Sequence, residues 1–247
     1  MNQSIPVRQT SSLSKSSCQH CSLSNLCLPL ALERDDMDHL DEVVNRDRIF
    51  TRGERVFTQS EPFRSCFAVK SGAIKTSVIT EAGDEQITGF FMPGELVGLD
   101  SLGDESHAST AKALERTSVC EIPVEQLERL VQTLPGLQHH MFHLMSQEIR
   151  NSQQLSVLLS KNTAEERIAA LLLSLSSRFQ RRRLSPTHFN LPMARNDIAN
   201  FLGLAVETVS RVFTRFQNQG LIRARGRDIE LLELQALQTM ALGNPQT

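Results

Sequence analysis

The stretch LPMARNDIANFLGLAVETVSRVFTRFQNQGLIRARGRDIEL, Leu191–Leu231, carries the most specific pattern in this sequence. Apolar residues at helical spacing predict a first helix over Arg195–Leu202 and a second over about Val206–Gln217. Gly203 lies between them, and two short helices that cross closely need a glycine at their turn. Residues 221–231 alternate about a glycine, which predicts a two-stranded wing with basic tips. The stretch therefore predicts a winged helix-turn-helix that binds double-stranded DNA.

Four outward side chains of the second helix have the chemistry needed to contact base edges in a major groove: Val206, Glu207, Ser210 and Arg211. An arginine can pair with guanine through two hydrogen bonds, and a glutamate can accept from the amino group of cytosine. A serine serves either role, and a valine can touch a thymine methyl group. A simpler reading makes Glu207 and Arg211 an ordinary surface pair four residues apart.

The C-terminal third of the chain is basic. From Thr163 onward there are eleven Arg, no Lys and seven acidic residues, whereas the whole chain has a net charge of −2. A basic end behind an acidic remainder favours a module that binds a polyanion. We expect the arginines outside the base-reading positions to contact phosphates: Arg215, Arg223, Arg225 and Arg227.

A long helix is expected over residues 137–161, ahead of the DNA-binding domain at residues 162–247. It carries an apolar stripe at mostly helical spacing, formed by Met141, Leu144, Met145, Ile149, Leu155, Leu158 and Leu159. A helix this long between two domains often pairs with its copy in a second subunit, which predicts a homodimer. Packing of the stripe against its own β-domain is the alternative.

Residues 31–136 have the texture of a β-domain. Five short runs have β-character: 55–58, 66–70, 73–79, 86–91 and 118–122. Glycines recur between them at spacings of 19, 11, 11 and 9 residues, at Gly53, Gly72, Gly83, Gly94 and Gly103. Regular short strands between turn signals predict a roll or sandwich. The fold class is thus α+β: a roll or sandwich domain, a long helix and a winged helix-turn-helix.

The five cysteines point to a metal centre. Cys18, Cys21 and Cys27 stand at C-x₂-C-x₅-C spacing within the segment 18–30. Three thiolates this close can reach one centre, and thiolates favour iron–sulfur clusters, zinc and Cu(I). A second cysteine pair or paired histidines, which structural zinc usually needs, do not follow at suitable spacing. A fourth thiolate would come from Cys66 or Cys120, and the residues alone leave that choice open.

Residues 1–17 are rich in Ser, Gln and Thr, and we expect them to be disordered. They contain no apolar run of the kind a secretory signal needs, and no apolar stretch in the chain is long enough to cross a bilayer. We therefore expect a cytoplasmic protein without membrane contact.

The chain resembles the CRP/FNR family of transcription regulators from Cys18 to about Leu234. The motifs that carry the resemblance are Pro93-Gly-Glu-Leu-Val-Gly98, Ala164-Glu-Glu-Arg-Ile-Ala169 and Val206-Glu-Thr-Val-Ser-Arg211. The resemblance implies a β-roll of the cyclic-nucleotide-binding type, a dimer helix and a helix-turn-helix. The catabolite activator protein, a DNA-binding protein with a helix-turn-helix, belongs to the same family.

Among the oxygen sensors of the fumarate–nitrate reduction type in this family, three N-terminal cysteines and one late in the roll hold a [4Fe–4S] cluster. Cys120 matches the late position, whereas Cys66 has no counterpart and is expected to be a core thiol. The resemblance implies that the cluster supports a homodimer, that molecular oxygen is the signal, and that RNA polymerase is a partner. It also implies palindromic DNA sites resembling TTGAT-N4-ATCAA.

Three rival functions remain. A cyclic-nucleotide receptor of the same fold would hold the cyclic phosphate with an Arg-Ser pair, but residues 103–110 contain two acids and no arginine. An enzyme or electron carrier is disfavoured because no phosphate loop, nucleophile elbow or metal–water motif is present, so we expect no catalytic activity. A constitutive DNA-binding protein with structural zinc is the third.

Overall fold

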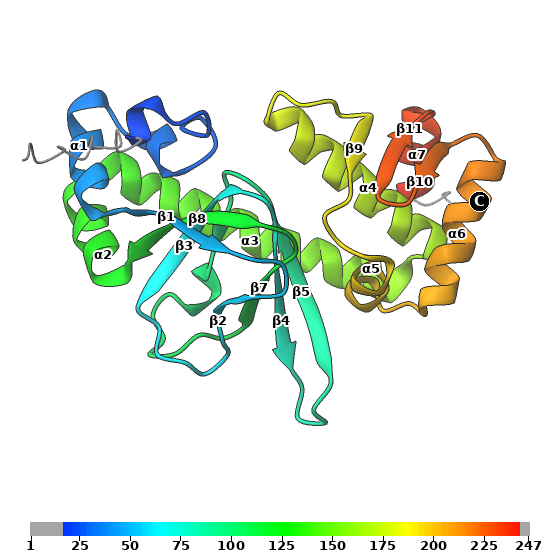
Figure 1. Cartoon of the computed structure of the whole chain (residues 1–247), viewed down its shortest axis with the longest axis horizontal. Coiled ribbons are helices and arrows are strands. Elements are labelled where there is room, and N and C mark those ends of the chain that lie inside the picture. Colours follow the sequence, from blue (N-terminus) through cyan, green and yellow to red (C-terminus); the bar gives the residue numbers. More distant parts are fainter. Residues whose placement is uncertain (1–16, 243–247) are drawn as a thin grey trace, which may run out of the picture.

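The structure, a computed structural model, describes residues 17–242 (Figure 1). The N-terminus that we expect to be disordered, residues 1–17, lies outside these residues except for Ser17. The described chain begins with two 3₁₀ helices and one α-helix: η1 (Cys18–His20), η2 (Leu28–Ala31) and α1 (Arg34–Val43).

The β-roll consists of two antiparallel four-stranded sheets. The first has the order β1 (Asn45–Phe50), β8 (Thr117–Pro123), β3 (Ser65–Ser71), β6 (Leu96–Val97). The second has the order β2 (Arg55–Phe57), β7 (Thr110–Ala113), β4 (Ile74–Ile79), β5 (Glu85–Phe91). A short 3₁₀ helix, η3 (Leu99–Ser101), lies between β6 and β7. The predicted roll is confirmed, but β1, β6 and β7 were not predicted. Strand β1 is rich in charged residues, β6 has only two residues, and β7 consists mostly of Ala and Lys, which are uncommon in strands.

The two faces of the first sheet pack against different parts of the molecule. Successive side chains of a strand point to opposite faces. Phe67 and Val69 therefore lie in the core between the two sheets, while Cys66 and Ala68 lie in a second core on the outer face. Residues from η2, α1 and the two helices that follow β8 complete this outer core.

Helices α2 (Val124–Thr133) and α3 (Pro135–Lys161) follow the roll directly. Helix α3 begins two residues before the predicted 137, because Pro135 occupies its first turn, where a proline loses no helical hydrogen bond. Gly136 allows α3 to approach η2 closely: a Cβ atom there would lie 2.5 Å from the carbonyl oxygen of Ala31. Figure 1 shows α3 running behind the roll toward the C-terminal module.

The C-terminal module confirms the predicted winged helix-turn-helix. Its elements are α4 (Ala164–Arg181), β9 (His188–Asn190), α5 (Arg195–Leu202), α6 (Val206–Asn218), β10 (Ile222–Arg225), β11 (Asp228–Leu231) and α7 (Leu234–Ala241). A capping box of Thr163 and Glu166 begins α4. Gly203 makes the turn between α5 and α6 with a φ of 61°, a conformation that suits glycine. Strand β9, which adds a third strand to the wing, and α7 were not predicted.

The module and the roll share one continuous apolar core. Ile87, Phe90 and Met92 of the roll belong to the same cluster of buried side chains as α4, α5 and α6. The rings of Phe90 and Phe201 lie with their centroids 5.0 Å apart. The two domains are therefore packed together as a hydrophobic core is packed.

Polar contacts reinforce this interface. The side-chain amide of Asn200 pairs with the backbone of β5, an edge strand: it donates to the carbonyl oxygen of Glu85 at 2.7 Å and accepts from the N–H of Ile87 at 2.6 Å. The Glu95 carboxylate accepts hydrogen bonds from Arg178 and, at 2.6 Å, from Arg182. Both arginines belong to the C-terminal module, so Glu95 joins the roll to it.

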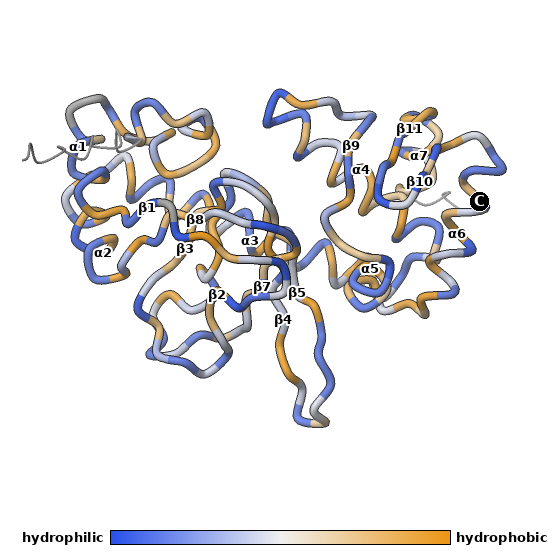
Figure 2. Tube along the Cα trace, viewed as in Figure 1, coloured by the Kyte–Doolittle hydropathy of each residue, from blue (hydrophilic) through white to orange (hydrophobic). Residues whose placement is uncertain are grey.

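Hydropathy changes over short distances along the trace (Figure 2). Of the helices within residues 17–242, none combines the length and the apolar character needed to span a membrane.

Candidate functional site

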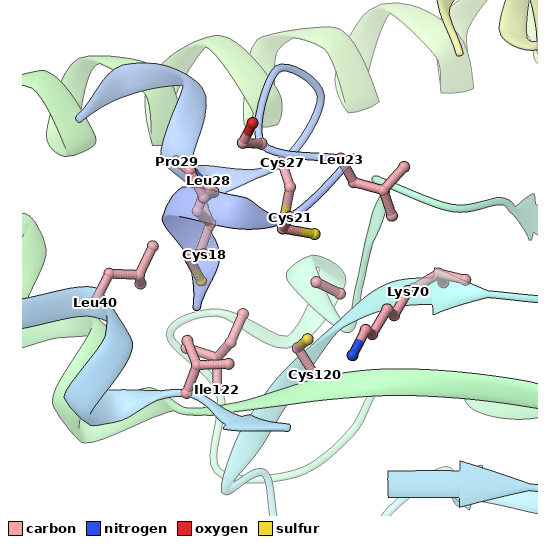
Figure 3. Close-up of a pocket in the computed structure, with 14 residues that line it drawn as sticks. Cys18, Cys21, Leu23, Cys27, Leu28, Pro29, Leu40, Lys70, Cys120 and Ile122 are labelled. Atoms are coloured by element: carbon pink, nitrogen blue, oxygen red, sulfur yellow. The ribbon is translucent and has the colours of Figure 1, made fainter. Parts of the chain in front are cut away.

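Four thiols line a single cavity between the cysteine-rich segment (residues 18–30) and the outer face of the first sheet (Figure 3). They belong to Cys18, Cys21, Cys27 and Cys120. The cavity measures about 430 Å³, including space open to solvent. Most of its other walls are apolar: Leu23, Leu28, Pro29, Leu40, Val44, Ala68, Val69 and Ile122.

Tight turns place the three cysteines of the segment around the cavity. The N–H of Cys21 donates to the carbonyl oxygen of Cys18 at 3.3 Å, and the N–H of Cys27 donates to that of Leu23 at 3.0 Å. Cys120 reaches the cavity from β8, where it lies opposite Ala68 of β3. The small side chain of Ala68 leaves space beside the thiol of Cys120.

The thiols experience one another's charge. Burial, together with the charges of the neighbouring Cys120, Cys18 and Cys21, raises the pKa of Cys27 to about 12. Burial also raises the pKa of Cys18 to about 11. Metal ions bind thiolates rather than thiols, so a metal entering this cavity has to displace protons.

Two cations lie beside the thiols, one at a thiol and one in the lining of the cavity. Arg46 donates a hydrogen bond to the sulfur of Cys18 at 3.2 Å. The amine of Lys70 points into the cavity beside Cys120 (Figure 3). Sequence reasoning missed both residues, because nothing in the pattern distinguishes them from other basic residues.

Cys66 lies on the same face of the sheet as Cys120 but does not line the cavity. It stands opposite Ile122, and its thiol donates to the carbonyl oxygen of Ile122 at 3.8 Å. Its side chain is fully buried, and burial raises its pKa to about 12. The structure therefore separates the two cysteines that the residues alone left open.

The thiols surround the cavity instead of meeting at one point. Within residues 17–242, no three His, Cys, Asp or Glu side chains come close enough to hold a single metal ion. A four-iron cluster makes a different demand, since each thiolate binds its own iron. His20, another potential ligand next to the cysteines, is exposed on η1.

The outward face of α6 forms a second candidate site. Glu207, Ser210 and Arg211 are exposed, and Val206 is half-buried at the first position of the helix. A hollow on this face is lined by Ser210, Arg211, Thr214, Arg215 and Asn218. The opposite face of α6 buries Val209, Val212, Phe213 and Phe216. The apolar face thus holds the helix while its polar face stays open to solvent.

The four arginines expected at phosphates have different surroundings. Arg215 pairs with Glu165, and Arg223 pairs with Glu230 across the wing. Arg227 donates to the carbonyl oxygen of Pro192 at 3.3 Å. Arg225 is exposed at the turn of the wing, beside Gly226. Arg225 and Arg227 both lie at the tip of the wing, and of these two Arg225 is exposed whereas Arg227 is half-buried.

The apolar stripe of α3 divides between two surfaces. Met141 is buried in the outer core of the roll, Leu144 packs against that core, and Leu158 packs against the core shared with the C-terminal module. Met145, Leu155 and Leu159 are half-buried, and Ile149 is 60% exposed. Phe142 and Val157, which the stripe did not include, are 58% and 59% exposed. Packing against the chain's own cores thus accounts for part of the stripe, and pairing with a second subunit stays a prediction for the exposed part.

Two family models match the chain. Residues 47–134 match the cyclic nucleotide-binding domain, and residues 166–240 match the Crp-like helix-turn-helix domain. Among solved structures, FixK2 from Bradyrhizobium japonicum has a TM-score of 0.74 and 30% sequence identity, with coverage of 80% of this chain and 97% of FixK2.

Characterised relatives match over most of their length. The transcriptional activator protein anr of Pseudomonas aeruginosa strain PAO1 is 54% identical over 243 residues, which is 98% of each chain. The fumarate and nitrate reduction regulatory protein of Escherichia coli K12 is 46% identical over 224 residues, with coverage of 91% of this chain and 90% of the relative.

Proposed function

Because the chain belongs to the CRP/FNR family of transcription regulators, we propose that it is an oxygen-responsive regulator of anaerobic metabolism whose cysteines hold a [4Fe–4S] cluster. The observation that carries this proposal is the placement of four thiols, Cys18, Cys21, Cys27 and Cys120, around one cavity. Clusters of this kind take four cysteine thiolates. The relatives named as transcriptional activators support the same function.

The surroundings of the thiols suit such a group. The apolar walls limit contact with water, and Arg46 and Lys70 bring positive charge to an otherwise anionic set of ligands. When bound, the cluster would supply an oxygen-labile link between the cysteine-rich segment and β8. The protein's part is to hold the four sulfurs at the correct separation and to shield them.

The cysteine-rich segment is in contact with the start of α3. Leu28 of η2 and Leu137 of α3 belong to the same buried core, and Gly136 lies against Ala31. A change in the segment therefore acts on the N-terminal turn of α3 directly. A group that binds one arrangement of α3 more tightly shifts the population toward that arrangement.

We infer that α3 pairs with its copy in a homodimer. Phe142, Ile149 and Val157 recur at about two-turn spacing and are each more than half exposed. Met145 lies about one turn from both Phe142 and Ile149 and is half-buried, so it extends this exposed apolar row, along which a second helix can pack. A two-fold dimer places two α6 helices about 34 Å apart, which fits one turn of DNA.

Helix α6 is proposed to read base edges with Val206, Glu207, Ser210 and Arg211. Arg225, at the tip of the wing, and the nearby Arg215, Arg223 and Arg227 would contact phosphates. A two-fold dimer requires a palindromic site, here one resembling TTGAT-N4-ATCAA. RNA polymerase is the proposed partner at promoters that the protein activates.

A cyclic-nucleotide receptor is the runner-up, because residues 47–134 match that domain family. The segment in which such receptors are expected to hold the phosphate, residues 103–110, contains two acidic residues and no arginine, and its Ser109 donates to the carboxylate of Asp100 at 2.7 Å. A carboxylate at this position repels a phosphate. The [4Fe–4S] proposal is therefore preferred, and dependence on a cyclic nucleotide becomes an outcome of the test.

The test is purification without oxygen, followed by measurement of iron, sulfide, visible absorbance and DNA binding before and after exposure to air. We expect a coloured protein that binds its palindrome and loses both properties in air. A colourless protein with bound zinc and unchanged DNA binding would support the constitutive alternative. Binding that requires an added cyclic nucleotide would support the runner-up.

The ligand set has its own test. Cys120→Ala is expected to abolish iron retention and anaerobic DNA binding, because a four-iron cluster then lacks one ligand. Cys66→Ala is the matched control, since this thiol lies in the same core but not at the cavity. Equal iron loss in both variants would refute the assignment of Cys120.

A further inference from the structure

We propose that Arg46, held in place by Asp41, is a positioning residue of the thiol site: it donates a hydrogen bond to the sulfur of Cys18 and so stabilises the bound cluster. This inference rests on the proposed function. Arg46 lies on β1, and its side chain is only 13% exposed. One of its terminal nitrogens is 3.2 Å from the sulfur of Cys18.

Asp41 fixes the orientation of the guanidinium group. Its Oδ1 atom accepts from Arg46 at 2.5 Å, and its backbone carbonyl oxygen accepts from the other terminal nitrogen of Arg46 at 3.1 Å. A guanidinium held at both ends has little rotational freedom left. Its remaining donor capacity is therefore directed at Cys18 rather than at solvent.

The same carboxylate also holds the backbone of the cysteine-rich segment. Oδ1 of Asp41 accepts from the N–H of Cys18 at 2.8 Å, and Oδ2 accepts from the hydroxyl of Ser17 at 2.5 Å. Arg46, Asp41 and Cys18 thus form a closed ring of hydrogen bonds. The ring sets both the position of the Cys18 backbone and the environment of its sulfur.

Charge explains what the ring contributes. Four thiolates and their cluster are anionic, and an anionic group in an apolar cavity needs hydrogen bonds or cations nearby. Hydrogen bonds to the sulfurs are among the factors that set the reduction potential of an iron–sulfur cluster. Residues that contact metal ligands typically change metal affinity about 10–100-fold when they are replaced. At Cys18, Arg46 supplies both a positive charge and a hydrogen bond to the sulfur.

A purely structural role is the alternative, since Arg46 also ties α1 to β1. Arg48 provides a matched control because it is an arginine two residues along the same strand that pairs with Glu121 at 3.1 Å. Its side chain is 50% exposed, and it stacks over Phe50 instead of reaching the cavity. Replacing Arg46 removes a hydrogen-bond donor from the sulfur of Cys18, whereas replacing Arg48 does not.

The experiment compares anaerobically purified full-length wild type, Arg46→Gln and Arg48→Gln. Iron and sulfide retained against an added chelator, the rate of absorbance loss in air and the midpoint potential are measured on each. For Arg46→Gln we expect retention to fall about 10–100-fold, the potential to shift downward and bleaching to accelerate. Arg48→Gln should match the wild type. Arg46→Lys, which keeps a cationic donor, should recover part of the retention.

Thermal unfolding of the cluster-free proteins separates the two roles. Similar melting temperatures for the two glutamine variants, combined with different cluster retention, support the positioning role. Equal retention and equal potential in both variants overturn this inference while leaving the four-thiol site intact. An anaerobic wild type without iron overturns the proposed function and this inference together.

Discussion

The roll carries two neighbours that are attached in different ways. The C-terminal module shares a continuous apolar core with the roll, in which Phe90 and Phe201 are in ring contact. The cysteine-rich segment instead lies over a cavity, with Leu28 as its fully buried anchor. Its polar contacts reach α1 through Asp41 and the edge strand β1 of the first sheet through Arg46.

This difference indicates which attachment can change at low cost. Regions with few buried apolar contacts open locally at a small fraction of the global unfolding free energy. The cysteine-rich segment fits that description when its cavity holds no cluster, whereas the interface of the module does not. A signal that acts on the segment therefore has little structure to disrupt, and the orientation of the module within a subunit stays fixed.

The largest effect is expected from Phe90→Ala at the interface with the module. Phe90 is 6% exposed, and removing a buried phenyl ring costs about 3–5 kcal/mol of unfolding free energy. Denaturant unfolding of the cluster-free protein measures it. Ile79→Ala, at a side chain 52% exposed on the neighbouring strand, should cost less than about 0.5 kcal/mol. A cost near 1 kcal/mol for Phe90→Ala would mean that the two domains unfold independently.

A somewhat smaller effect is expected from Glu95→Gln, about 2–3 kcal/mol at neutral pH, because Arg178 and Arg182 lose their shared carboxylate. Glu230→Gln, in an exposed pair on the wing, should cost less than about 1 kcal/mol.

The carboxylate of Glu95 also makes the free energy of unfolding depend on pH. Burial alone would raise the pKa of Glu95, but Arg178 and Arg182 outweigh it and hold the pKa below its ordinary value of 4.5. A lowered folded-state pKa contributes stability that is complete above the ordinary pKa and is lost as the pH falls through the lowered one. The difference between wild type and Glu95→Gln should therefore shrink below about pH 4.5. A difference that stays constant down to pH 3 would contradict this linkage.

Asn200→Ala should have a moderate effect of about 1–2 kcal/mol, because it leaves the N–H of Ile87 without its acceptor at a buried position. Hydrogen exchange at the Ile87 amide is the direct measurement and should accelerate. Asn196→Ala, at an exposed position of the same helix, is the control. Unchanged exchange at Ile87 would show that the edge strand is protected by something other than Asn200.

Local patterns predicted most of the fold. The spacing of Val209, Val212 and Phe216 specified α6, and the position of Gly203 specified the turn before it. Strand β9 could not be predicted in this way, because its three residues become a strand only by pairing with β11, some forty residues away.

The candidate site was predictable only in part. The spacing of Cys18, Cys21 and Cys27 indicated a metal centre, but the residues alone did not separate Cys120 from Cys66. That separation depends on strand register, which places Cys120 opposite Ala68 and Cys66 opposite Ile122. Asp41 and Arg46 carried no signal at all, since a charged residue reveals its partner only when the chain is folded.

The smallest loss of unfolding free energy is expected from Leu28→Ala. This variant tests most directly whether the cysteine-rich segment is attached less firmly than the C-terminal module. Leu28 is 1% exposed, so a rigidly held site would lose several kcal/mol on truncation. If the segment detaches locally at low cost, however, the loss cannot exceed that local cost, about 1 kcal/mol in cluster-free protein. Leu30→Ala, on the same 3₁₀ helix and 56% exposed, is the control and should change little. A loss at Leu28 as large as that at Phe90 would show that the two attachments are equally rigid, and the segment would then be too firmly held to respond to the loss of a cluster alone.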